Sequence, residues 1–148
     1  MKPQSGLATL YRVRQQELEG KNRDLARVRQ QLTRIDNQIA QLQGYRKDYR
    51  IHIANRQGDS TYRVQDRQLF LARLEQSIEA LAQNRQEYAA LEHQALQELR
   101  GAYERAEALR KTMDRIARGQ KLEKLRLEQS QCDEQGRIAT NCRLSTGN

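Results

Sequence analysis

The feature that most constrains this chain is a repeat of apolar residues spaced alternately three and four apart, which runs in two long stretches. The repeat begins at Leu18, is lost over residues 56–61, and then resumes. A sustained repeat of this kind predicts amphipathic helices that bury one apolar stripe against another helix. The interruption reads Arg-Gln-Gly-Asp-Ser-Thr, which is a cluster of turn-forming residues. The sequence therefore predicts two long helices joined by one turn.

Assigned to heptads, the first stretch has Leu18, Leu25, Leu32, Ile39 and Ile53 at position a and Val28, Ile35, Leu42 and Tyr49 at position d. The second has Leu71, Ile78, Leu99 and Met113 at a and Leu74, Leu81, Tyr88, Ala95, Ala102, Leu109 and Ile116 at d. Charged residues interrupt both stripes, Lys21 and Arg46 in the first and Arg85 and Glu92 in the second. We therefore expect the second stripe to pack weakly at its centre.

Composition supports long helices with little compact core. Only 36% of the 148 residues are hydrophobic, 31% are charged, and Pro3 is the one proline. Globular domains usually carry nearer 45 to 50% apolar residues. We predict an all-α fold, a long two-helix antiparallel coiled-coil hairpin over residues 1–134, with a flexible tail at 135–148. Its parts are a helix at 7–56, a turn at 57–63 and a helix at 64–129.

A short turn between two such helices makes them antiparallel neighbours. If the turn is centred near Ser60, Tyr49 lies opposite Leu71, Leu18 opposite Ala102, and Tyr11 opposite Leu109. In this register Tyr45 and Phe70 occupy g positions beside the stripe, close to Leu42, Tyr49, Leu74 and Leu81. Two helices cannot cover all of that apolar surface, and an exposed aromatic patch is typical of a partner site. The alternative is that these side chains only widen the seam near the turn.

No pattern in the sequence indicates catalysis. There is no glycine-rich phosphate loop followed by lysine and serine or threonine, and His52 and His93 have no partners at metal-ligand spacing. We predict no enzyme activity, no catalytic residue, no metal and no cofactor. No apolar run approaches the roughly 20 residues that span a bilayer, and residues 1–11 do not resemble a signal peptide. We therefore expect a cytoplasmic protein.

The formal net charge of +8 and the pI of about 9.9 favour an acidic partner. The basic residues are interspersed with acidic ones, for example Asp24 within 23–34 and Asp114 and Glu123 within 110–124. That arrangement differs from a basic arm devoted to phosphates. We predict no nucleic-acid partner, while a nucleic-acid-binding coiled coil and a general coiled-coil scaffold remain the alternative hypotheses.

Four stretches, in order around one turn, resemble the FliJ and YscO-like stalk proteins of bacterial type III secretion, in the flagellar branch. The first, at 41–50, reads Gln-Leu-Gln-Gly-Tyr-Arg-Lys-Asp-Tyr-Arg. The second, at 70–79, reads Phe-Leu-Ala-Arg-Leu-Glu-Gln-Ser-Ile-Glu. The third runs from Tyr103 to Arg110 and the fourth from Glu128 to Glu134. The resemblance covers about residues 7–134, although family members often carry tryptophan where this chain has Leu99.

The resemblance implies a non-enzymatic central stalk of the flagellar type III export apparatus, peripheral at the inner membrane and an escort for export chaperones. It implies two partner-binding surfaces. A turn-proximal patch would dock the membrane export gate and consists of Gln38, Leu42, Tyr45, Tyr49, Phe70, Leu74, Ser77 and Leu81. A terminal patch at the open end would bind the hexameric export ATPase and consists of Leu7, Leu10, Tyr11, Arg14, Leu109, Met113 and Ile116. No residues can be assigned to the chaperones.

Overall fold

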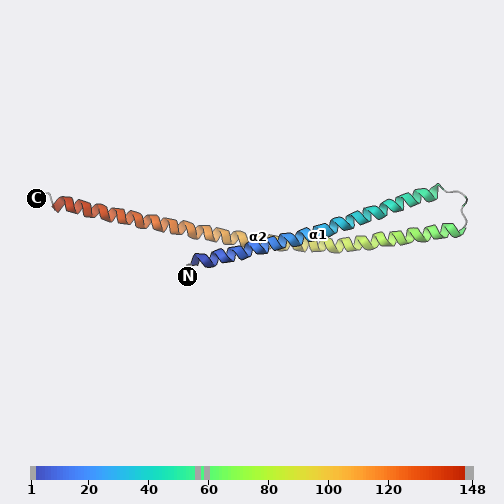
Figure 1. Ribbon diagram of the computed structural model, residues 1–148, viewed down its shortest axis with the longest axis horizontal. Coiled ribbons are helices and arrows are strands. Elements are labelled where there is room, and N and C mark those ends of the chain that lie inside the picture. The colour runs from blue at the N-terminus through green and yellow to red at the C-terminus, as the bar shows by residue number, and fades with distance from the viewer. Residues whose placement is uncertain (1–2, 56–57, 59–60, 146–148) are drawn as a thin grey trace. The chain divides into compact units, whose positions relative to one another are not determined.

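A computed structural model describes residues 3–55, 58 and 61–145, with side chains described at 6–55, 58 and 61–140. It contains two helices that pack against each other, α1 (Pro3–Ala54) and α2 (Thr61–Ser145) (Figure 1). Proline suits the first turn of α1, since the backbone N–H that it lacks would have no partner within the helix there. The predicted all-α fold with two antiparallel helices is confirmed.

The first helix was expected at 7–56 and lies at Pro3–Ala54, so it begins and ends earlier than predicted. The second was expected at 64–129 and lies at Thr61–Ser145, so it extends further at both ends. Loss of the heptad repeat after Gln129 removes a packing surface, but no proline follows to break the backbone hydrogen bonds of the helix. The flexibility of residues 135–148 stays a prediction, and residues 146–148 lie outside those described.

The predicted turn at 57–63 is shorter in the structure, since residues 61–63 belong to α2. Residues 57, 59 and 60 of that prediction lie outside the described residues. Gly58 has a φ of +89°, in a region that side-chain-bearing residues rarely adopt. Asn55 donates a backbone hydrogen bond of 3.2 Å to the carbonyl of Ile51, which extends the helical pattern just past the end of α1.

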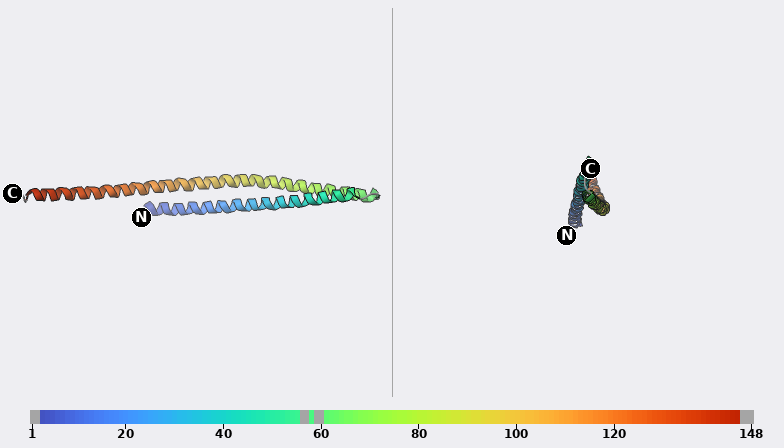
Figure 2. Two further views of the ribbon diagram at one scale, coloured as in Figure 1. Left: turned by 90° about the horizontal axis from the view of Figure 1, so that it is seen from above. Right: turned by 90° about the vertical axis from the view of Figure 1, so that its right-hand side faces the viewer.

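The chain divides into two compact units. Unit 1 contains residues 1–15 and 104–148, and unit 2 contains residues 16–103. Unit 2 is the hairpin proper, in which the two helices lie side by side and run in opposite directions (Figure 2). Each unit pairs a segment of α1 with a segment of α2, and each is described separately below.

Ion pairs across unit 2 fix how its helices face each other. Lys21 Nζ lies 3.0 Å from a carboxylate oxygen of Glu98, and Arg29 Nε lies 3.5 Å from one of Glu92. Two further pairs join Asp36 to Arg85 and Arg50 to Glu75. Residue numbers rise along α1 as those of their partners fall along α2, which is the pattern of antiparallel helices. A turn centred near Ser60 places the residue before Arg85 opposite Asp36. The ion pair between Asp36 and Arg85 is therefore one residue from the predicted register.

The buried apolar residues of unit 2 lie in the half of the unit that is away from the turn. Leu25, Leu32 and Ile35 on α1 are buried with 4 to 8% of their surface exposed, and Ala102 on α2 is fully buried. Three charged interruptions of the heptad stripes, Lys21, Arg85 and Glu92, are members of the cross-helix ion pairs. The sequence led us to expect weak apolar packing at the centre of the second stripe. At that position, Arg85 and Glu92 form ion pairs with α1, beside its buried apolar residues.

Candidate partner-binding sites

Tyr45, Tyr49 and Phe70 of the turn-proximal patch come together around one hollow in unit 2. This hollow has a volume of about 490 Å³ and is also lined by Asp48 and His52. The rings of Tyr49 and Phe70 lie 4.7 Å apart between centroids, at an interplanar angle of 50°. Aromatic pairs favour such separated and tilted arrangements because of the charge distribution of the rings. The contact joins α1 to α2 at a position one residue from the predicted facing pair of Tyr49 and Leu71.

These aromatic rings are not all covered by the hairpin. Tyr45 is 54% exposed and Phe70 is 48% exposed, whereas Tyr49 is half-buried. Two g positions on antiparallel helices flank the same side of the seam, so the aromatic side chains form one open surface instead of filling the interior. The prediction that two helices leave an apolar surface uncovered here agrees with these exposures.

The other members of the turn-proximal patch are placed differently. Leu42, Leu74 and Leu81 are half-buried, as residues of the seam are. Gln38 is exposed and lines a separate polar groove along α1. Ser77 is exposed, and its hydroxyl donates a 3.1 Å hydrogen bond to the Arg73 carbonyl. The structure therefore brings the three aromatic residues together, with the leucines supporting the seam beneath an open face.

Asp48 and His52 line the aromatic hollow but were not among the predicted site residues. His52 lies one heptad after Tyr45, so the repeat itself places both side chains on the same helical face. That spacing was the signal that could have included it. Asp48 precedes Tyr49 on the outer side of α1, and the sequence alone gave no indication that it borders the aromatic rings.

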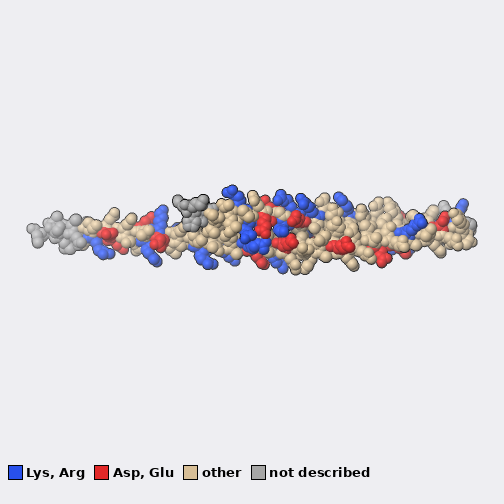
Figure 3. All heavy atoms as spheres, turned by 90° about the horizontal axis from the view of Figure 1, so that it is seen from below, with Lys and Arg blue, Asp and Glu red and all other residues tan. Residues whose placement is uncertain are grey.

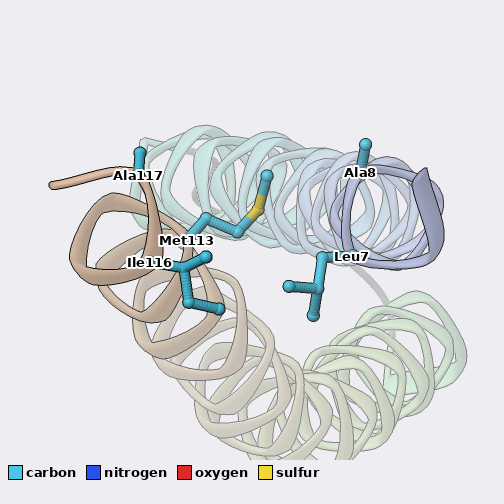
Figure 4. Close-up of a pocket in the computed structure, with 5 residues that line it drawn as sticks. All are labelled: Leu7, Ala8, Met113, Ile116 and Ala117. Carbon is cyan, nitrogen blue, oxygen red and sulfur yellow. The ribbon is translucent and has the colours of Figure 1, made fainter. Parts of the chain in front are cut away.

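In unit 1, three members of the terminal patch surround a second hollow. Leu7, Met113 and Ile116 line an apolar cavity of about 270 Å³ together with Ala8 and Ala117 (Figure 4). Leu10 is 40% exposed and Ile116 is 37% exposed, while Leu109 and Met113 are half-buried. The cavity therefore opens on an accessible surface. The two alanines were missed in the sequence because small residues beside a heptad stripe carry no chemical signal.

Tyr11 and Arg14, the polar members of the terminal patch, are half-buried. Nearby, Arg110 forms ion pairs within α2 to Glu107 and to Asp114, the latter at 3.0 Å. Hydrogen bonding from Arg110 lowers the pKa of the Glu107 carboxyl, so this acid stays ionised. The hydrogen bond to Glu107 raises the pKa of Arg110, with a smaller contribution from Tyr11 on α1. Both local carboxylates are therefore engaged by an arginine of the same helix.

On the face shown in Figure 3, the described residues form no continuous basic tract. Lys and Arg side chains are interspersed there with Asp and Glu among the residues described. Nucleic-acid-binding surfaces concentrate positive charge on one face or along one helix. The described residues include no group of three or more His, Cys, Asp or Glu side chains able to hold a metal. Nor does either described helix contain a segment apolar enough to cross a membrane.

Comparison with known proteins gives one informative match. The family model described as "Flagellar FliJ protein" matches residues 3–143, which is nearly the whole chain. No curated protein and no solved structure gives a significant match. The match spans α1 from its first residue and includes α2 almost to its end.

Proposed function

The chain belongs to the flagellar FliJ protein family, whose members are components of flagellar type III export, and from this premise we propose that it acts as the central stalk of the export apparatus. In this role it has no chemistry of its own. The terminal patch binds the hexameric export ATPase, and the turn-proximal patch binds the membrane export gate. The protein works in the cytoplasm and reaches the inner membrane through these partners, where it also receives export chaperones.

The observation that carries this proposal is the exposed aromatic surface of unit 2. Tyr45 and Phe70 remain about half exposed even though each lies beside the seam. Aromatic residues are enriched at the centres of protein interfaces, where a few anchors supply most of the binding free energy. An export stalk needs such a surface because it acts by holding partners. The aromatic hollow is therefore assigned to the export gate.

The decisive experiment replaces Tyr45 and Phe70 together with alanine. We expect binding to the cytoplasmic part of the export gate to weaken at least tenfold, and motility to be lost, while helicity by circular dichroism is retained. Tyr103→Ala is the matched control, because Tyr103 is also an aromatic residue of unit 2 and is 56% exposed. Unchanged gate binding in the double variant contradicts the assignment. A collapse of helicity would mean that these rings are part of the seam.

The ATPase assignment has its own test. Met113→Asp places a charge in the apolar cavity of unit 1, and we expect the chain to lose binding to the purified hexameric ATPase. Arg73→Asp introduces the same side chain at an exposed position of unit 2 and should bind normally. Full ATPase binding by Met113→Asp would rule out the terminal patch as the contact.

A titration with duplex and single-stranded nucleic acid at physiological salt separates the proposal from the nucleic-acid alternative, which predicts steeply salt-dependent binding.

A further inference from the structure

The cavity in unit 1 is lined entirely by apolar side chains. Leu7 and Ala8 belong to α1, and Met113, Ile116 and Ala117 belong to α2. In Figure 4, Met113 and Ile116 extend from α2 toward the space beside Leu7, while Ala8 and Ala117 contribute only methyl groups. A larger residue at either alanine would occupy part of this space. The two small residues therefore keep the cavity open.

The size of the cavity limits what can occupy it. Its volume is about 270 Å³, whereas an apolar cavity of about 150 Å³ in another protein holds a benzene ring. Pockets for small-molecule ligands usually measure about 300–1,000 Å³ and contain a few polar groups that orient the ligand. The cavity of unit 1 is smaller and lacks lining polar side chains. It suits one apolar side chain of a protein partner better than a cofactor or metabolite.

The charges around the cavity define the surface that would carry this side chain. Arg12 on α1 and Lys111, Arg115 and Lys121 on α2 are exposed. Two nearby acids of α2, Glu107 and Asp114, are paired with Arg110, and the exposed Glu123 lies among the lysines and arginines that follow the cavity. On balance, the exposed charge in this part of unit 1 is therefore positive. A complementary surface carries carboxylates, because like charges across an interface are costly.

On the basis of the proposed function, we propose that the cavity receives one leucine, isoleucine or methionine side chain from an acidic segment of the export ATPase. Ala8 and Ala117 are the specificity-determining residues, because their size decides whether the side chain can enter. Carboxylates beside the inserted residue face Arg115 and Lys121. An inserted apolar anchor of this kind typically dominates the binding free energy of an interface.

The test fills the cavity without adding charge. Ala117→Leu places a branched side chain in the space from α2, and Ala8→Leu does so from α1. Ala108→Leu is the control, because Ala108 is exposed on α2 in the same unit and does not line the cavity. Leucine and alanine are both strong helix formers, so helicity should be unchanged in all three variants. We expect Ala117→Leu and Ala8→Leu to weaken binding to the purified ATPase hexamer at least tenfold, and Ala108→Leu to bind normally.

A second arm tests the charge of the partner. Arg115→Glu combined with Lys121→Glu should weaken binding to the hexamer and reduce its dependence on salt concentration, while Arg63→Glu with Arg73→Glu in unit 2 should have no effect. If the variant with Arg115→Glu and Lys121→Glu keeps its binding and its salt dependence, the partner segment is not acidic.

Four further outcomes contradict the assignment of the cavity. If both cavity-filling variants bind the hexamer as tightly as the unaltered chain, the assignment is overturned. An equal loss of ATPase binding in Ala108→Leu also overturns it. If sedimentation instead shows that Ala117→Leu abolishes self-association, the occupant is a second copy of this chain. Failure of the unaltered chain to bind the ATPase is distinguishable from all of these, and it overturns the proposed function together with the cavity assignment.

Discussion

The middle of the hairpin and the region beside its turn follow the same heptad repeat but expose their side chains very differently. In the middle, Leu25, Leu32 and Ile35 are at most 8% exposed, with ion pairs beside them. Beside the turn, Tyr45 and Phe70 are about half exposed. Both regions belong to unit 2, so the comparison is made within one compact body. Stability should therefore depend mainly on the middle of the hairpin, and the proposed partner binding on the region beside its turn.

The largest expected difference comes from shortening a leucine in each region. Leu32→Ala removes a side chain that is only 8% exposed and should lower the free energy of unfolding by about 3 kcal/mol. Leu42→Ala removes the same group from a half-buried position, where less apolar surface and a smaller cavity are at stake. Urea denaturation followed by circular dichroism measures both. Equal losses would show that the two regions are packed alike.

Two glycines give a smaller effect, with opposite signs. Gly58 has a φ of +89°, so Gly58→Ala should lower the free energy of unfolding by about 1 kcal/mol. Gly44 lies within α1, and a methyl group added there meets nothing within 4 Å. Gly44→Ala should therefore raise the free energy of unfolding by about 1 kcal/mol. The same denaturation measurement applies, and stabilisation by both substitutions would contradict the backbone conformation at the turn.

The cross-helix ion pairs should contribute less, and only at low salt. Arg85 donates hydrogen bonds to Asp36 from both Nε and Nη2, whereas Arg50 donates one to Glu75. We expect Arg85→Ala to lower the melting temperature slightly more than Arg50→Ala in dilute buffer. Near 1 M salt, where the Debye length is about 3 Å, both decreases should largely disappear. A double-mutant cycle between Asp36 and Arg85 isolates the pair, and zero coupling at low salt would show that this pair adds nothing to stability.

The smallest expected effect is a dependence of stability on pH. Hydrogen bonding from Lys21 lowers the pKa of the Glu98 carboxyl below its ordinary value of 4.5. Because the pKa is lower in the folded state, the pair stabilises the hairpin fully above the ordinary value, and this is lost as the pH falls through the folded pKa. Thermal melts between pH 6 and 3 should show a slightly steeper loss than those of Glu98→Gln. Identical pH profiles would mean that the pair adds nothing.

Much of the fold could be predicted because a heptad repeat relates each residue to a helical face. The repeat indicated two helices, their antiparallel pairing and a register within one residue of the Tyr49 and Phe70 contact. The end of α2 was less predictable, because a helix can continue past Gln129 on helix propensity without a packed stripe. The aromatic residues of the turn-proximal patch could be predicted from their g positions. Asp48, Ala8 and Ala117 could not, because their roles as lining residues depend on which neighbours surround them.

By itself, the sequence determined that this chain forms long helices, that a turn between them makes them antiparallel, and that some aromatic residues must lie beside the seam. These follow from periodicity, helix propensity and turn chemistry, which are properties of neighbouring residues. Only the tertiary structure decided that charged interruptions such as Arg85 find partners across the hairpin, and that Leu7 and Met113 leave a cavity beside two alanines. Both depend on side-chain conformations and on how closely the paired helices approach, which a repeat does not specify.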